Sequence, residues 1–218
     1  MLYIDSADRD QLAPLLATGL FAGVTTNPTI LARAGLTADD LPELAAWLRA
    51  GGVTRFYAQA TGTTVEELRA TAQRIADLGD DVVIKLVATE PALAVARELT
   101  DAGREVLVTA VYHPAQALLA AAAGAQEIAP YVGRTSENGR DGIALVAAIA
   151  RSAPSVRILA ASLRSSDQVA AVAAAGAHDL TLAPAIARAL FEDELTLAAS
   201  AEFEALVAAS TRTPAVPL

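Results

Sequence analysis

The sequence contains no cysteine, so it has no disulfide, no thiolate metal ligand and no thiol nucleophile. Histidine is nearly as scarce. His113 and His178 are the only two, and neither has companions spaced to form a metal site or a catalytic triad. We therefore expect neither a metal centre nor thiol chemistry. A chain without cysteine also fits a cytoplasmic location.

Basic charge is in short supply as well. The formal net charge is -9 at pH 7 and no basic stripe is present, which argues against general nucleic-acid binding. No apolar run reaches the roughly 18 residues of a membrane span. The first residues, Met1 to Asp5, lack a basic start and a cleavage pattern, so they predict a first strand rather than a signal peptide.

Lysine is the most informative scarcity, because the chain has one lysine, Lys85, among fifteen arginines. A codon bias toward arginine explains why lysines are few. It does not explain why the one lysine lies within the apolar run 82–87. Arginine stays protonated and cannot supply a neutral amine. We predict that Lys85 attacks a ketone to form an iminium, an electron sink toward which a carbon–carbon bond can break. The alternative is a structural lysine paired with a carboxylate.

Short apolar runs alternate with longer helical patterns eight times along the chain. Helices rich in alanine and leucine are predicted at 64–78, 91–102 and 114–123. This order predicts one (β/α)8 TIM barrel spanning residues 1–218 as a single domain. An open doubly wound sheet is the alternative, but no glycine-rich turn follows the first strand. The predicted strands are 2–5, 23–25, 55–59, 82–87, 106–111, 127–132, 157–161 and 179–182.

An additional C-terminal segment, 192–218, follows the eighth strand. Residues 192–209 predict an amphipathic helix that carries Leu195, Phe203 and Val207, and residues 211–218 form a tail. This helix either closes the barrel or docks on a neighbouring subunit.

The active site of this fold lies at the carboxyl ends of the strands. The side chains found there suit carbonyl chemistry on a hydroxylated, phosphorylated substrate. Two of them, Arg134 and Arg164, are predicted either to clamp a phosphate or to be solvated loop arginines. The full set is Asp5, Thr25, Asn27, Gln59, Lys85, Thr109, Tyr131, Arg134, Ser162 and Arg164.

Four other residues of this set have a proposed catalytic or binding role and, for three of them, a structural alternative. Asp5 steers or deprotonates a substrate hydroxyl, or it caps the helix that follows. Asn27 holds a substrate hydroxyl, or it caps the helix that starts at residue 28. Gln59 and Tyr131 share a water that moves protons during catalysis, although Tyr131 also suits a core position.

Several segments resemble the transaldolase family, and within it the small fructose-6-phosphate aldolase group. They are 2–5, 22–28 with the motif Gly23-Val24-Thr25-Thr26-Asn27-Pro28, 83–85, 109–112, 129–134 and 159–162. The resemblance runs from Met1 to about Phe203. It implies a barrel enzyme with a Schiff-base lysine, no cofactor and no metal, acting on small sugars or sugar phosphates. It further implies a homo-oligomer, a decamer of paired pentamers, with the C-terminal helix crossing to a neighbour.

Two positions separate the subgroups. The transaldolases have glutamate and phenylalanine where this chain has Gln59 and Tyr131, and the aldolases have glutamine and tyrosine. The resemblance thus implies cleavage of fructose 6-phosphate into dihydroxyacetone and glyceraldehyde 3-phosphate. A transaldolase and a non-catalytic sugar-phosphate-binding barrel are the alternatives. Departures from the family at Val87, His113 and Arg164 bear on acceptor preference.

Overall fold

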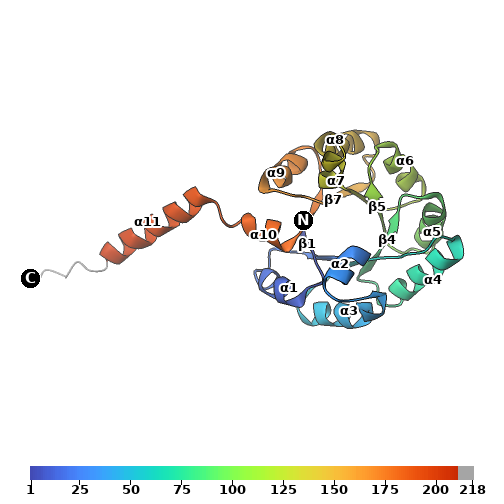
Figure 1. Ribbon diagram of the computed structural model, residues 1–218, viewed down its shortest axis with the longest axis horizontal. Helices are drawn as coiled ribbons and strands as arrows, with labels where there is room; N and C mark the ends of the chain where they lie inside the picture. The colour runs from blue at the N-terminus through green and yellow to red at the C-terminus, as the bar shows by residue number, and fades with distance from the viewer. Residues whose placement is uncertain (211–218) are drawn as a thin grey trace, which may run out of the picture.

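The computed structural model describes residues 1–210, and the predicted tail at 211–218 lies outside the described residues. Eight parallel strands close into a barrel in chain order, which confirms the predicted (β/α)8 architecture (Figure 1). The strands are β1 Leu2–Asp5, β2 Gly23–Thr25, β3 Phe56–Gln59, β4 Val82–Val87, β5 Val106–Val111, β6 Glu127–Pro130, β7 Arg157–Ala160 and β8 Asp179–Leu182.

Helices surround the barrel and connect its strands. Capping residues begin several of them. At the start of α4 (Val65–Ala76), for example, the Thr64 hydroxyl accepts from the Glu67 amide, and the Glu67 carboxylate accepts from the Thr64 amide. The elements are α1 Arg9–Leu16, α2 Pro28–Arg33, η1 Ala38–Asp40, α3 Leu41–Ala50, α4 Val65–Ala76, α5 Glu90–Asp101, α6 Ala115–Ala122, α7 Val132–Glu137, α8 Gly142–Ser152, α9 Ser166–Ala174, α10 Pro184–Ala189 and α11 Glu194–Ser210.

Three strands are shorter than predicted, and the change matters most in β6. This strand ends at Pro130 rather than at residue 132. Tyr131 forms only an isolated bridge to Ala161, and the short helix α7 begins at Val132. Tyr131 therefore stands where the chain turns from strand to helix, at the carboxyl end of the barrel.

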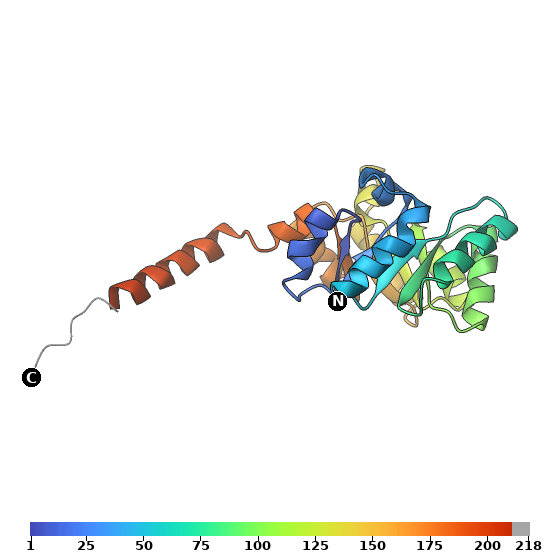
Figure 2. The same ribbon diagram turned by 90° about the horizontal axis from the view of Figure 1, so that it is seen from below.

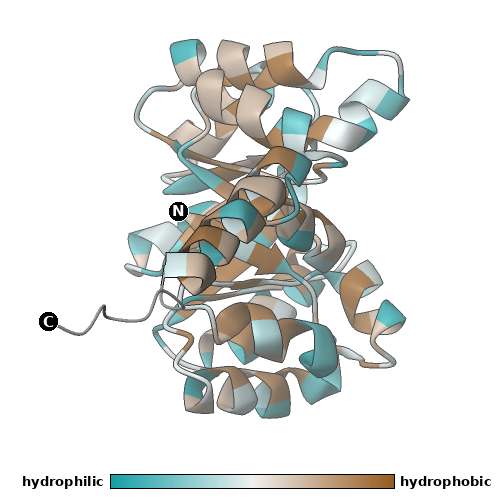
Figure 3. Ribbon diagram, turned by 90° about the vertical axis from the view of Figure 1, so that its left-hand side faces the viewer, coloured by the Kyte–Doolittle hydropathy of each residue, from teal (hydrophilic) through white to brown (hydrophobic). Residues whose placement is uncertain are grey.

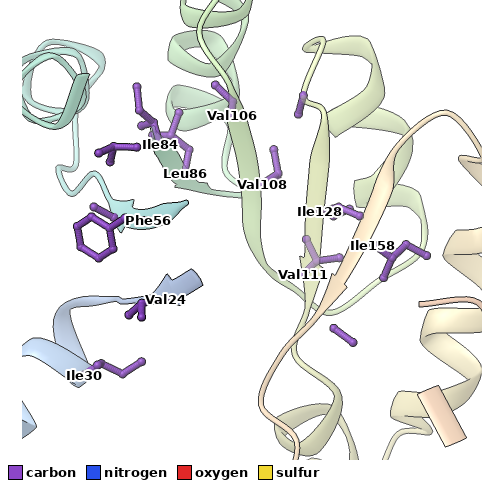
Figure 4. Packing of buried hydrophobic residues seen from close by; sticks show 14 of the residues in the cluster. Val24, Ile30, Phe56, Ile84, Leu86, Val106, Val108, Val111, Ile128 and Ile158 are labelled. Atoms are coloured by element: carbon purple, nitrogen blue, oxygen red, sulfur yellow. The ribbon is translucent and has the colours of Figure 1, made fainter. Parts of the chain in front are cut away.

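Strand alternation divides the barrel into two apolar clusters. Outward residues such as Ile84 and Leu86 pack against the helices in the larger cluster (Figure 4). Val83 belongs to a separate inner cluster with Tyr3 and Tyr57, whose rings meet edge to face at 5.3 Å between centroids. Because successive strand side chains point to opposite faces, the alternation that turns Val83 inward also turns Lys85 inward.

The helix α11 stands apart from the barrel. It extends away from α10 as a separate rod in Figures 1 and 2, and none of its residues is buried. The expectation that it closes the barrel is therefore wrong, because α10 packs against α1 and β1 instead. Figure 3 shows apolar segments, coloured brown, along α11. Two of its apolar side chains, Leu195 and Phe203, have exposed fractions of 82% and 63%.

No helix within residues 1–210 has the length and apolar character needed to cross a lipid bilayer.

Gly23 is required by the close approach of two strands. A Cβ atom at this position would collide with the backbone carbonyl of Arg55, next to β3. We predict that Gly23→Ala lowers the free energy of unfolding by about 1–3 kcal/mol, because backbone on both sides must shift. Urea denaturation measures this value. Gly51→Ala is the matched control, since a Cβ there meets no atom closer than 3.4 Å. An equal effect of both substitutions would contradict the steric argument.

Candidate functional site

A pocket of about 190 Å³ opens at the carboxyl end of the barrel around Lys85. The helix α2 contributes Thr29, Ile30 and Arg33 to its lining, and Ala161 and Ala183 add small apolar surfaces. Seven of the ten predicted site residues border it: Asp5, Asn27, Lys85, Tyr131, Arg134, Ser162 and Arg164. The structure therefore brings together groups from β1, β4, the β6 end and several loops.

Lys85 is buried, with 4% of its surface exposed, and its Nζ donates a hydrogen bond of 2.8 Å to the Thr26 carbonyl. It forms no ion pair with any carboxylate in residues 1–210. The alternative of a lysine locked to a carboxylate is thus wrong. Burial lowers the pKa of Lys85 from its ordinary value, against the opposing charge of Asp5.

Asp5 lies at the end of β1 in the same pocket. Its Oδ1 accepts a 2.6 Å hydrogen bond from the Thr25 hydroxyl, which also lies 2.6 Å from the Thr181 hydroxyl. Burial raises the pKa of Asp5, and the charge of Lys85 counteracts that rise. Asp5 does not cap the following helix, because Asp8 accepts the first amides of α1. Its carboxyl group is therefore available to the pocket.

Tyr131 presents its phenol to the pocket. The phenol oxygen accepts a 3.3 Å hydrogen bond from the Thr109 hydroxyl, which leaves the phenolic proton for another acceptor. Burial raises the pKa of Tyr131. The Arg134 guanidinium lies 5.0 Å from the ring centroid, and the Tyr112 ring meets Tyr131 edge-on at 5.8 Å. These contacts hold the ring in one orientation.

The backbone is strained at one residue in β5 and at one residue after β7, the two strands that neighbour β6 and Tyr131. Ala110 in β5 and Ser162 after β7 adopt φ values of 55° and 61°, in the left-handed region that non-glycine residues avoid. Ala110 coincides with a register shift in the pairing of β5 with β6. Strain and bulges of this kind concentrate at functional sites, where they aim side chains.

The loop residues Asn27 and Ser162 each have a second task. The Asn27 side-chain oxygen accepts from the Ile30 amide at 3.1 Å, so the predicted cap of α2 is present. The Ser162 hydroxyl oxygen accepts from the Arg134 amide at 3.2 Å and ties two loops of the mouth together. Both side chains nevertheless border the pocket.

Three guanidinium groups reach the pocket, of which one was missed by the sequence prediction. Arg134 and Arg164 were expected there, and Arg164 donates from Nε to Glu137 at 2.8 Å. Arg33, the last residue of α2, was not predicted. Arg33 follows Thr29 by four residues and Ile30 by three, and residues at these spacings share one face of a helix. This spacing is the sequence signal that could have identified Arg33.

Gln59 does not border the Lys85 pocket. The register pairs it with Lys85 across β3 and β4. It lines instead a separate hollow of about 170 Å³ beside Leu41 of α3 and Thr71 of α4. Thr25 and Thr109 do not line the pocket either, but they bind Asp5 and Tyr131, which do.

The described residues contain no group of three or more histidine, aspartate or glutamate side chains placed to hold a metal ion.

The fold and the pocket at its mouth define the class of (β/α)8-barrel enzymes. The chain belongs to the transaldolase/fructose-6-phosphate aldolase family, whose model matches residues 2–216. Curated relatives include the probable transaldolases of Rhodospirillum centenum and Anaeromyxobacter sp. strain K. The first is 36% identical over 89% of this chain and 85% of its own length, and the second is 36% identical over 92% and 93%.

More distant solved structures share the barrel alone. A FabK mutant from Thermotoga maritima matches with a TM-score of 0.56 at 18% identity over 84% of this chain, and a mandelate oxidase mutant with 0.59 at 16% identity over 85%. This chain covers 60% and 65% of those chains. Family membership makes the protein an enzyme with a sugar-phosphate aldolase or transaldolase activity, so the alternative of a non-catalytic binding barrel is not retained.

The burial of Lys85 predicts a pH dependence of stability. Because its pKa is lowered on folding, the unfolded chain binds more protons than the folded protein between that lowered pKa and the ordinary value of 10.5. The free energy of unfolding contributed by Lys85 therefore rises with pH, and its burial penalty vanishes above 10.5. We predict that Lys85→Met is more stable than the wild type below this window and that the difference shrinks as pH rises through it.

Urea denaturation of both proteins over a series of pH values measures this difference. The comparison cancels the titration of groups that do not interact with Lys85. A difference that grows as the solution becomes more alkaline would contradict the lowered pKa.

Proposed function

We propose that the protein is a Schiff-base aldolase that cleaves fructose 6-phosphate into dihydroxyacetone and glyceraldehyde 3-phosphate. The observation that carries the proposal is the buried amine of Lys85, which forms no ion pair with a carboxylate in residues 1–210. The amine borders a pocket that also holds a phenol and a carboxyl group. The proposed substrates are small sugars and sugar phosphates, and no cofactor is required.

Catalysis begins with the neutral amine of Lys85. Its nitrogen attacks the substrate ketone, the carbinolamine loses water and an iminium forms. Burial favours the uncharged amine, and the hydrogen bond to the Thr26 carbonyl orients it toward the pocket. The Asn27 amide nitrogen and the Ser162 hydroxyl border the same space and are suited to bind substrate hydroxyl groups.

Cleavage of the carbon–carbon bond follows. The electron pair of that bond moves toward the iminium and leaves an enamine, while the adjacent hydroxyl loses its proton as the aldehyde departs. Tyr131, through a water, and Asp5 are the proposed proton carriers. Protonation of the enamine carbon and hydrolysis of the resulting iminium then release dihydroxyacetone and regenerate Lys85. In this scheme Gln59 acts with Tyr131 on the water.

A transaldolase is the second candidate, because the curated relatives named above are called probable transaldolases. In that reaction the enamine on Lys85 attacks a second aldehyde instead of being protonated and released. Tyr131 favours the aldolase, since its phenol borders the pocket and can protonate the enamine. Gln59, the other sorting residue, borders a different hollow and supports the choice less directly.

One incubation tests both levels of the proposal. With fructose 6-phosphate as the only substrate, we expect free dihydroxyacetone to appear in solution. Borohydride reduction should add a three-carbon or sugar adduct that peptide mass spectrometry assigns to Lys85. Adduct formation without free dihydroxyacetone, and a new seven-carbon sugar phosphate only after addition of erythrose 4-phosphate, would identify the transaldolase instead.

Lys85→Arg is the control for this incubation, because it keeps the positive charge but has no neutral amine. We expect no adduct and no turnover from this variant, with wild-type solubility. An adduct elsewhere in the wild-type chain, or none, would overturn the Schiff-base mechanism.

We further propose a cytoplasmic homo-oligomer, a pentamer or decamer, in which α11 packs against a neighbouring copy. The large apolar side chains Leu195, Phe203 and Val207 on α11 are exposed, and an isolated exposed helix gains little stability by itself. Helix propensity alone does not account for leucine, phenylalanine and valine side chains placed in water.

Light scattering tests this assembly. We predict that Phe203→Asp reduces the particle mass toward that of one chain, because the buried charge would lack a partner. Ala201→Asp is the matched control, since it adds the same charge about 200° away around the helix by the 3.6-residue period. A wild-type monomer at working concentration would contradict the proposal.

A further inference from the structure

Arg33 occupies a wall of the Lys85 pocket that the proposed mechanism leaves unused. It ends α2, and it shares its helix face with Thr29 and Ile30, which also border the pocket. Figure 2 shows α2 and α7 at the same end of the barrel, and Figure 1 separates them across its centre. Arg33 thus approaches the mouth from α2, whereas Arg134 approaches it from α7.

Ion pairing sets Arg33 and Arg134 apart from most other arginines. Each of the following pairs with a carboxylate in residues 1–210: Arg9, Arg49, Arg55, Arg69, Arg74, Arg97, Arg104, Arg157 and Arg164. Arg33 and Arg134 form no such pair in that part of the chain, although carboxylates outnumber cations overall. Unpaired guanidinium groups that border a pocket in an acidic protein indicate an anionic ligand.

The competing charges near the pocket are already engaged. Arg164 binds Glu137, so part of its charge is neutralised before any substrate arrives. Arg33 also borders shallow hollows shared with Asp8, whose carboxylate instead binds the first amides and the side chain of α1. The carboxyl that shares the Lys85 pocket, Asp5, accepts from Thr25.

We infer that Arg33 is a specificity-determining residue that binds the substrate phosphate jointly with Arg134. The inference rests on the proposed function for the identity of the ligand as a sugar phosphate. Two guanidinium groups on separate elements can each donate a pair of N–H groups to one phosphate, which fixes its position as well as its charge. Arg164 is then a secondary ligand that must share its charge with Glu137.

Two measurements on Arg33→Gln test the inference. The first is the affinity for inorganic phosphate, followed by calorimetry without any substrate. The second is the preference for phosphorylated acceptors, as the ratio of kcat/KM for glyceraldehyde 3-phosphate to that for glyceraldehyde, with dihydroxyacetone as donor. We expect phosphate affinity and this ratio to fall about tenfold, the usual scale of one lost charge-assisted hydrogen bond.

Arg151→Gln is the matched control, because Arg151 is exposed on α8 and also lacks an ion pair within the described residues, but does not border the pocket. Arg33→Lys keeps the charge and should restore part of both losses. Equal phosphate affinity in Arg33→Gln, Arg151→Gln and the wild type would overturn the role of Arg33.

The outcome for Arg33 is separable from that of the proposed function. If dihydroxyacetone and borohydride label Lys85 but Arg33→Gln retains wild-type phosphate binding and acceptor preference, the inference fails and the aldolase proposal stands. If Lys85 is not labelled, the proposed function fails, and the calorimetric comparison alone still decides whether Arg33 binds phosphate.

Discussion

The hydrogen bond from the Lys85 amine to the Thr26 carbonyl is the contact on which the site depends. A buried amine without any acceptor is costly, and an ion pair would favour its charged form. The Thr26 carbonyl is a single neutral acceptor. It satisfies the buried amine without stabilising the charged form as strongly as a carboxylate would. The carbonyl belongs to the residue that follows β2, so the orientation of the amine depends on β2 as well as on β4.

The barrel supplies the rigid support that this contact requires. Large aromatic side chains, Tyr3 and Tyr57, fill the interior away from the mouth. The inner space nearest the carboxyl ends holds Asp5, Lys85 and Tyr131, which border the pocket. Close backbone approaches at Gly23 and Gly133 bring neighbouring strands and loops together, since a Cβ atom at either position would strike a carbonyl oxygen. The strained residues Ala110, in β5, and Ser162, after β7, belong to the chain segments on either side of β6, the strand that Tyr131 follows.

Charge at the mouth opposes the charge of the whole chain. The protein carries a net charge of -9, yet three arginines border the Lys85 pocket. Asp5 is the only carboxylate among the described residues that line it, and burial raises its pKa. The local field therefore favours a negatively charged substrate group although the distant field does not, because nearby charges in a partly buried site are screened less.

The sequence by itself determined the barrel, because eight apolar runs separated by helical patterns leave few other arrangements. It also singled out Lys85, because one lysine within an apolar strand has a cost that only chemistry or pairing offsets. Tertiary structure alone decided that Gln59 borders another hollow, that Glu137 engages Arg164 and that α11 leaves the barrel. Those outcomes depend on contacts between side chains from distant parts of the chain, and local periodicity carries no information about such tertiary contacts.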